Sequence, residues 1–238
     1  MITISKVSIY GFQEAIRGMR NPMNSWDKSD SKVLHNNQKF RLGDERIYMD
    51  HSVNGYIVGP KDKQLMKNLC KAGPDHRKFM RMIVVYVDIT APLYWWKEFD
   101  TYKVGTVANS CSTMHKIHAK EFTLFDFSHE HLTIGSMSIL AYIIDKLNER
   151  RNCYLNYDEL SKKDYFATGI TKKDIWWDMI QLLPSSYNKK RTVMMNYEVL
   201  ANIYKSRKGH RLDEWHKFRE WVETLPCSDL ITEADSDE

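Results

Sequence analysis

The spacing of apolar positions changes along the chain, and each spacing predicts one type of element. Residues 2–12 (ITISKVSIYGF) alternate apolar and polar side chains, which predicts a half-buried strand. Residues 79–90 (FMRMIVVYVDIT) are apolar on both faces and rich in β-branched side chains, which is typical of a central strand. A further short strand is expected at 54–59.

Helical spacing of apolar residues predicts six helices, at 60–73, 92–103, 136–151, 171–184, 192–209 and 212–226. Pro60 and Pro92 suit first turns, Ser136 is the expected N-cap of its helix, and Thr171 with Asp174 forms a capping box. These elements predict an α+β fold, in which residues 1–228 form a single domain with a central antiparallel or mixed sheet flanked by helices. The acidic residues 229–238 are predicted to form a disordered tail.

Composition narrows the functional classes. The chain has 238 residues, which is ample to bury a core, and a net charge of only +4. Such a charge permits an anionic small ligand but argues against a nucleic-acid partner. The four cysteines are scattered and no signal peptide is recognisable, so free thiols in the cytoplasm are expected. No apolar run is long enough to cross a membrane.

Several common site motifs are absent from the sequence. It contains no P-loop, no Rossmann glycine motif and no serine nucleophile elbow. A group of cysteine and histidine residues has the spacing of zinc ligands, but such residues also occur by chance in a polar loop: Cys111, His115, His118, His129 and His131. We therefore predict no metal site.

Two segments have the character of a binding site. Residues 99–117 (FDTYKVGTVANSCSTMHKI) are small, polar and rich in hydroxyls, which is typical of a ligand-binding loop. In the predicted helix 192–209, one apolar face ends at Arg207, and a buried-facing arginine needs an acceptor such as a phosphate or a uracil carbonyl. The alternative for the basic clusters 187–191 and 205–211 is a solvated helix end. The tryptophan pairs are expected in the core and in subunit contacts.

The order and spacing of two blocks resemble those of the flavin-dependent thymidylate synthases. The first block is LMKNLCKAGPDHRKFMRMIVVYVDITAP, followed by the aromatic helix and the serine-rich loop. The second is LLPSSYNKKRTVMMNYEVLANIYKSRKGHRLDEWHKF. The resemblance covers roughly half the chain. It implies the fold of that family, transfer of a one-carbon unit to a uracil nucleotide (dUMP), FAD as cofactor with NADPH and methylenetetrahydrofolate, and a homotetramer.

In the second block the resemblance assigns a role to each matching residue. Arg207 corresponds to the arginine that binds and polarises the uracil ring, and Lys190 or Arg191 to the arginine that grips the nucleotide. Asn196 and Asn202 correspond to asparagines that contact the flavin. One further residue, one position away from the family's histidine, is also assigned to the cofactor: His210.

The first block departs from the family's signature, which is Arg-His-Arg, seven residues and then serine. Here the triplet is Thr101-Tyr102-Lys103, and the serine, Ser112, stands one position late. Ser112 and Arg207 are the two candidate catalytic residues. The remaining assignments are nucleotide binding by Glu98 and Asn109, and cofactor binding by Tyr102, Lys103, Thr106 and His76. The loss of two cationic donors should weaken flavin binding by a factor of about 10² to 10⁴. Arg17 and Arg20 are candidates to compensate.

Two other functions remain open on the sequence. The rewritten signature favours a binding protein that holds a nucleotide or nucleotide-like signal without flavin chemistry. A structural or nucleic-acid-binding protein would use the two basic clusters and would show strongly salt-dependent binding. The retained Arg207 and the two asparagines favour the enzyme, which is the function we predict.

Overall fold

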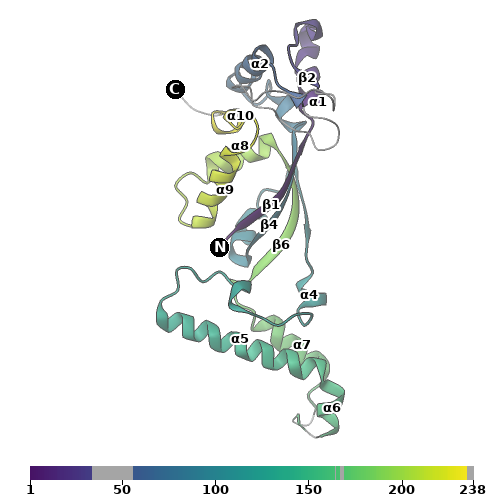
Figure 1. The fold of residues 1–238 in the computed structure, drawn as a ribbon, viewed down its shortest axis with the longest axis vertical. Helices are drawn as coiled ribbons and strands as arrows, with labels where there is room; N and C mark the ends of the chain where they lie inside the picture. Colours follow the sequence, from purple (N-terminus) through teal and green to yellow (C-terminus); the bar gives the residue numbers. More distant parts are fainter. Residues whose placement is uncertain (34–55, 164, 167–168, 235–238) are drawn as a thin grey trace, which may run out of the picture. The chain divides into compact units, whose positions relative to one another are not determined.

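The computed structural model describes residues 1–33, 56–163, 165–166 and 169–234 (Figure 1). Its strands are β1 (Thr3–Tyr10), β2 (Lys32–Val33), β3 (Tyr56–Ile57), β4 (Val84–Pro92), β5 (Thr106–Ser110) and β6 (Asn188–Asn196). Its α-helices are α1 (Phe12–Arg20), α2 (Pro60–Lys71), α3 (Leu93–Phe99), α4 (Thr113–Lys116), α5 (Ile134–Leu155), α6 (Tyr157–Lys162), α7 (Lys172–Gln181), α8 (Tyr197–Ser206), α9 (Asp213–Glu223) and α10 (Asp229–Thr232). Short 3₁₀ helices are η1 (Asn21–Met23), η2 (Trp26–Lys28), η3 (Lys78–Arg81) and η4 (Leu124–Asp126). The predicted α+β class is confirmed.

The main sheet has the strand order β1-β4-β6-β5, and a separate pair is formed by β2 and β3. Two hydrogen bonds fix the direction of β6 against β4. The backbone N–H of Tyr197 donates to the carbonyl of Ile83 over 3.1 Å, and the Thr192 hydroxyl donates to Asp88 over 2.6 Å. The residue number falls on one strand as it rises on the other, so this pair is antiparallel.

The chain divides into two compact units, each assembled from separate stretches of sequence. Unit 1 contains residue 1 with 90–99 and 110–191, and unit 2 contains 2–89, 100–109 and 192–238. Strands β4 and β6 contribute residues to both units. That residues 1–228 form a single domain therefore stays a prediction.

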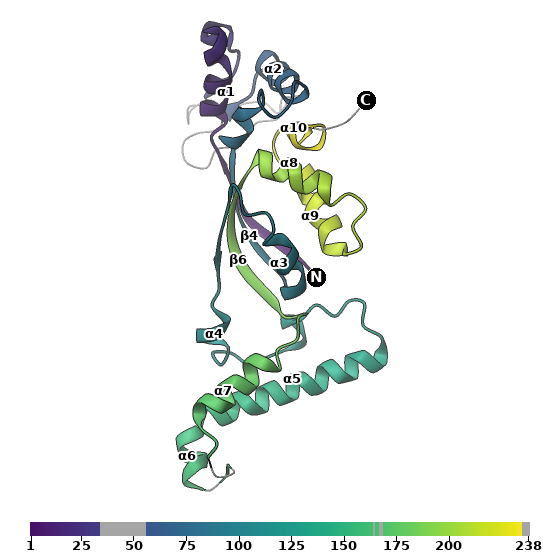
Figure 2. The same ribbon diagram turned by 180° about the vertical axis from the view of Figure 1, so that it is seen from behind.

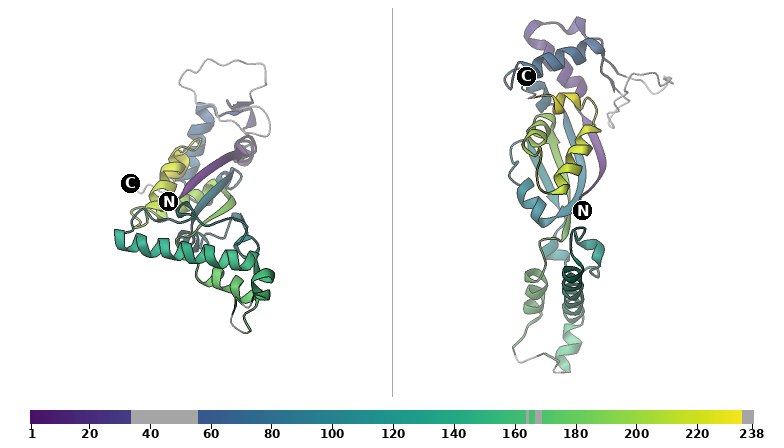
Figure 3. Two further views of the ribbon diagram at one scale, coloured as in Figure 1. Left: turned by 60° about the horizontal axis from the view of Figure 1, so that its bottom comes forward. Right: turned by 90° about the vertical axis from the view of Figure 1, so that its left-hand side faces the viewer.

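Unit 2 buries the inward face of its strands beneath helices. Val85, Val87 and Ile89 alternate along β4 and are at most 1% exposed. Helix α8 contributes Leu200 and Ile203 to the same core, and it packs against α10 and η3. Figure 3 (right) shows α8, α9 and α10 on one side of the strands β1 and β4. This helical layer carries the arginine singled out by the sequence.

Unit 1 is built around the packing of α5 along α7 (Figure 2). Thr171 begins α7 with the predicted capping box, whereas Thr133 rather than Ser136 caps α5. Helix α3 adds a cluster of packed rings: Trp95 stacks on Phe99, and Trp96 meets both edge to face. The core of the helical pair consists of Ile117, Phe122, Phe127, Leu140, Ile144, Leu147 and Met179.

Several predicted elements differ from the structure. The predicted helix 92–103 is shortened to α3, since Pro92 ends β4 and residues 100–103 lie between α3 and β5. Residues 192–196, predicted as helix, extend strand β6, because Val193 and Met195 are both fully buried with a period of two. The helix begins only at Tyr197, where Asn196 caps it. Residues 79–81, predicted as strand, belong to the 3₁₀ helix η3.

The C-terminal segment also differs from the prediction. Residues 229–232 form α10 rather than a disordered tail, because Leu230 and Ile231 are buried. Asp229 accepts ion pairs from Lys63 at 3.0 Å and Lys67 at 2.9 Å. Burial alone would raise the pKa of Asp229, but the hydrogen bonds from Lys67 and Lys63 outweigh it and lower the pKa. The acidic C-terminal segment thus includes a short helix that packs on the core.

Parts of the predicted strand 54–59 and of the predicted tail lie outside the described residues. None of the helices in the described stretches combines the length and hydropathy of a membrane span.

Candidate functional site

Arg207 contacts two aromatic rings in unit 2. It stands directly after α8, where its backbone N–H donates to the carbonyl of Ile203 over 2.9 Å. Its Nε donates to the hydroxyl of Tyr102 over 2.9 Å. Its guanidinium carbon lies 4.5 Å from the ring centroid of Trp215 and 5.3 Å from that of Tyr102. Cation–π contacts and a hydrogen bond therefore orient the guanidinium together.

Three separate segments build this arrangement, which we call the Arg207 cage (Arg207, Tyr102, Trp215 and His210). Tyr102 lies between α3 and β5, and Trp215, fully buried, lies in the first turn of α9. The two rings meet edge to face, 6.2 Å apart at 73°. His210 lies 6.2 Å from Trp215 in the connection from α8 to α9, and its Nδ1 accepts the backbone N–H of Leu212 over 3.1 Å. That bond places the proton of a neutral His210 ring on Nε2.

The loop that carries Tyr102 packs closely against the start of α8 at a glycine. Gly105 has φ +74°, and a Cβ there would lie 3.0 Å from Nδ2 of Asn196 and 3.0 Å from Cγ2 of Val199. Asn196 itself caps the helix, since its Oδ1 accepts the Val199 backbone N–H over 3.0 Å. The predicted flavin contact of Asn196 therefore falls on a residue with a structural task of its own.

Next to this glycine stands a polar atom that needs a partner. The hydroxyl of Thr106 is buried and has no hydrogen-bond partner among the described residues. Buried hydroxyls are normally hydrogen-bonded, and an exception is often a place where a ligand or water binds. Other predicted site residues of unit 2 are exposed: His76, Lys103, Asn109 and Asn202.

The remaining predicted site residues belong to unit 1. The Arg191 guanidinium carbon lies 4.2 Å from the ring centroid of Trp96, and the Trp96 indole N–H donates to the carbonyl of Lys189 over 2.8 Å. Lys190 is exposed, whereas Glu98 is half-buried. The structure thus supports Arg191 by an aromatic ring, in the same manner as Arg207.

Ser112, the predicted catalytic serine, has a local role in the structure. Its hydroxyl accepts the backbone N–H of His115 over 3.2 Å and so caps the short helix α4. The side chain is exposed. Within the described part of the chain, no three His, Cys, Asp or Glu residues are placed to hold a metal ion.

Arg20, a candidate to replace the missing phosphate-binding cations, is committed elsewhere. It is 5% exposed, and its Nε and Nη2 each lie 2.7 Å from Oδ1 of Asp62, which is fully buried. Burial alone would raise the pKa of Asp62, but hydrogen bonds from Ser29, Ser31 and Arg20 outweigh it and lower the pKa. Arg20 therefore serves the fold, while Arg17 is exposed.

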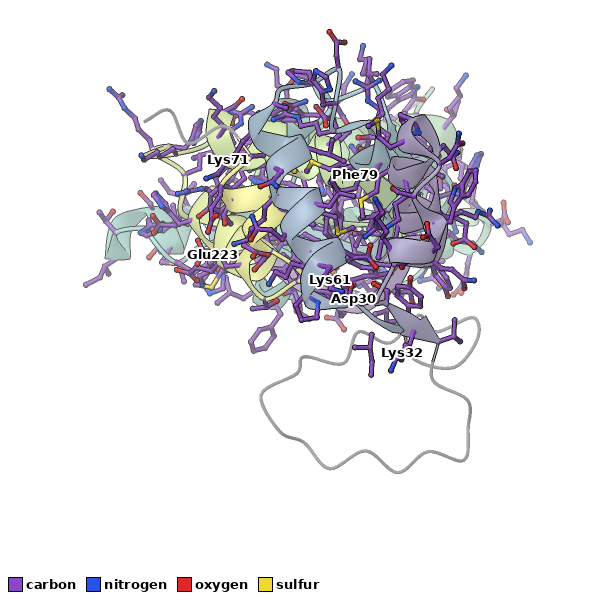
Figure 4. The ribbon with its side chains drawn as sticks, turned by 90° about the horizontal axis from the view of Figure 1, so that it is seen from above. Asp30, Lys32, Lys61, Lys71, Phe79 and Glu223 are labelled. Carbon is purple, nitrogen blue, oxygen red and sulfur yellow. The ribbon has the colours of Figure 1, made fainter. Side chains whose placement is uncertain are left out.

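Asp30, whose backbone N–H donates to Asp62, also fixes the start of α2. Figure 4 shows Asp30 beside Lys61 at this point. The Asp30 carboxylate accepts the backbone N–H groups of Lys61 over 2.9 Å and of Asp62 over 3.0 Å. These are N–H groups that the first turn of a helix leaves without intrahelical partners.

Sequence reasoning missed Trp215 as a site residue. It was expected in the core, and it is fully buried, but its ring face also carries Arg207. The spacing between residues 207 and 215 gives no helical or strand relation, because a turn separates them. One available signal was the rule that a buried-facing arginine requires neighbours that stabilise its charge.

Unit 2 places groups that could contact a planar ring or a phosphate. Arg207 supplies an oriented, charged donor for a planar carbonyl-bearing ring. On the flavin side, Lys103 is the one cation in the triplet 101–103, and the Thr106 hydroxyl is a group that a bound ligand can satisfy.

Comparison with known proteins places the fold. The sequence matches no protein-family model and no curated protein. Among solved structures, it is similar to flavin-dependent thymidylate synthase ThyX from Helicobacter pylori crystallised with FAD and dUMP, with TM-score 0.60, 14% identity, and coverage of 97% of this chain and 99% of that chain. A second crystal structure of ThyX from that organism, also with FAD and dUMP, gives TM-score 0.59, 13% identity and 99% coverage of both chains. The chain therefore has a ThyX-like fold, as the sequence predicted.

Proposed function

We propose that this protein is a divergent flavin-dependent thymidylate synthase-like enzyme that binds a uracil nucleotide, dUMP, and transfers a one-carbon unit to it. The orientation of Arg207 by its contacts with Tyr102 and Trp215 is the observation that carries the proposal. The fold of ThyX, two structures of which hold FAD and dUMP, supports it.

In this proposal Arg207 binds the uracil ring. A guanidinium donates charge-assisted hydrogen bonds to carbonyl oxygens, and such bonds strengthen as negative charge develops on the ring. An arginine that is already oriented loses less conformational freedom on binding, so more of the interaction energy appears as affinity. The aromatic contacts of Arg207 provide this orientation.

The other nucleotide contacts follow the sequence resemblance. Arg191 or Lys190 is proposed to grip the nucleotide, and Arg191 has its guanidinium on the face of Trp96. Glu98 and Asn109 are proposed as further nucleotide contacts. Ser112 is retained as a candidate catalytic residue, although its hydroxyl caps α4.

Bound FAD would supply the reducing equivalents, as flavins do in enzymes generally. We propose that Thr106, with its buried hydroxyl, helps to hold it, together with Asn196, Asn202, His210, Tyr102, Lys103 and His76. NADPH and methylenetetrahydrofolate would complete the reaction. A homotetramer and a cytoplasmic location complete the proposal, and light scattering of the purified protein tests the tetramer.

The first experiment is an absorption spectrum of the concentrated protein, before and after incubation with FAD and desalting. A retained flavin band supports the enzyme. The Arg207→Ala variant should lose most dUMP affinity in a calorimetric titration, because a charged hydrogen-bond donor is worth about 1.5–3 kcal/mol. Lys208→Ala is the matched control, since Lys208 is an exposed neighbouring cation and should leave dUMP affinity unchanged. Equal dUMP affinity in the two variants contradicts the assignment of Arg207.

A second function is favoured by the triplet Thr101-Tyr102-Lys103 and by the commitment of Arg20 to Asp62. Both observations reduce the cations available for a flavin phosphate. In this alternative the protein binds a nucleotide or nucleotide-like signal without flavin. A colourless protein that does not take up FAD but does bind dUMP would establish the alternative.

A further inference from the structure

We propose that Tyr102 is a positioning residue for Arg207: its hydroxyl and ring, with the ring of Trp215, fix the guanidinium before a ligand arrives. The inference rests on the proposed function, because it assigns Arg207 to the uracil nucleotide. It goes beyond that function by assigning Tyr102 to the arginine, whereas the sequence resemblance assigns it to the cofactor.

Arginine side chains have many rotamers, so an arginine that binds a planar ligand needs outside support. Arg207 is only half-buried, and burial alone therefore does not fix it. The hydrogen bond from Nε to the Tyr102 hydroxyl fixes one edge of the guanidinium. The rings of Trp215 and Tyr102, 4.5 Å and 5.3 Å from the guanidinium carbon, add contacts that restrict its plane. A planar fork held in this way has a defined plane and direction.

The two aromatic residues differ in what fixes them. Trp215 is fully buried in α9 and packs edge to face on Phe218 at 5.7 Å, so it is part of the core. Tyr102 is half-buried on a connecting loop. Its position depends on Gly105, which brings the loop against Asn196 and Val199 at the start of α8. Tyr102 is therefore the adjustable part of the cage, and a change there alters Arg207 without opening the core.

Two substitutions separate the hydroxyl from the ring. Tyr102→Phe removes the hydrogen bond to Arg207 and keeps the ring, and Tyr102→Leu removes both. Loss of a single hydrogen bond should weaken dUMP binding roughly 3–10-fold. Loss of the cation–π contact as well should weaken it roughly 5–50-fold. Tyr142→Phe is the control, because Tyr142 is an exposed tyrosine of α5 and should change nothing.

The ligand-free protein supplies an independent measurement. In ¹⁵N-labelled protein, the Nε–Hε signal of Arg207, assigned by its loss in Arg207→Lys, should exchange slowly with water. In Tyr102→Phe it should exchange faster, while the thermal unfolding midpoint measured by circular dichroism stays close to that of the unchanged protein. A merely structural tyrosine would lower the midpoint and leave the affinity of the remaining folded protein unchanged.

The outcomes separate the inference from the proposed function. Unchanged exchange of the Arg207 signal in Tyr102→Phe, or unchanged dUMP affinity in Tyr102→Leu, overturns the inference. If the protein without substitutions does not bind dUMP, the proposed function fails. The exchange measurement still decides whether Tyr102 positions Arg207. If the protein binds dUMP and Arg207→Lys binds it equally well, the assignment of Arg207 fails while the Tyr102 contact is tested as before.

Discussion

Replacing Arg20 with alanine should destabilise the protein strongly and leave nucleotide binding unchanged. Arg20 and Asp62 are 5% and 0% exposed, and their guanidinium and carboxylate groups are joined at 2.7 Å. Removal of one partner of a buried ion pair leaves an uncompensated buried charge, which typically costs about 3–5 kcal/mol.

The surroundings of Asp62 place the expected cost at the lower end of that range. Without Arg20, Oδ2 of Asp62 still accepts hydrogen bonds from the hydroxyls of Ser29 and Ser31, each over 2.6 Å. It also accepts the backbone N–H groups of Asp30 over 3.2 Å and Ser31 over 3.1 Å. These donors stabilise the charge in part, so we expect a loss of about 3 kcal/mol for Arg20→Ala.

Chemical denaturation followed by circular dichroism measures this change. Arg17→Ala is the matched control, because Arg17 is an exposed arginine of the same helix and should cost less than about 0.5 kcal/mol. The double variant Arg20→Ala/Asp62→Ala should cost less than the sum of the single changes, since the second removal eliminates the stranded charge. A loss of unfolding free energy below about 1 kcal/mol for Arg20→Ala, together with weakened dUMP binding, would refute this reasoning. Arg20 would then be a ligand-binding residue.

Three further predictions concern single features of the fold. The pKa of Asp62 is lowered from 3.8, so its contribution to the free energy of unfolding is present above pH 3.8. That contribution is lost as the pH falls through the folded-state pKa. Acid denaturation of Asp62→Asn should therefore lack this part of the transition. Gly105→Ala should cost more than Gly73→Ala, because both have positive φ but only Gly105 has neighbours within 4 Å; equal losses of unfolding free energy would contradict this. Thr171→Ala should cost about 1 kcal/mol through loss of the capping box of α7, and an unchanged thermal midpoint would contradict it.

The sequence predicted those elements whose pattern is set locally. Pro60 begins α2 as expected, and the alternation of residues 3–10 forms β1, because these signals need no distant partner. The prediction of a helix at 192–196 was wrong because Thr192 and Val193 favour strands, and burial of alternate residues against other elements decided the conformation. The tail was mispredicted because its charge obscured two buried residues, Leu230 and Ile231.

The candidate site was predictable in its residue types but not in its contacts. Arg207 was found from the end of an apolar face, and the structure places it at the end of α8. Its partner Tyr102 lies 105 positions away in the sequence. Likewise, the buried Arg77 pairs with Glu198 at 3.1 Å across 121 positions. Contacts of this range depend on the fold, and no local spacing encodes them.

The two halves of the proposed function therefore rest on different physical grounds. Binding of the nucleotide depends on Arg207, whose orientation is supported by Tyr102 and Trp215. Binding of flavin depends on phosphate-binding cations, and the structure commits Arg20, one of the candidates to replace them, to Asp62. Each lost charged donor costs about 1.5–3 kcal/mol of binding free energy. We therefore expect this protein to have lost more affinity for flavin than for the nucleotide. If the protein instead retains FAD through desalting while dUMP binds weakly, this order is reversed, and the cations that hold the flavin must then be sought outside Arg20 and the triplet 101–103.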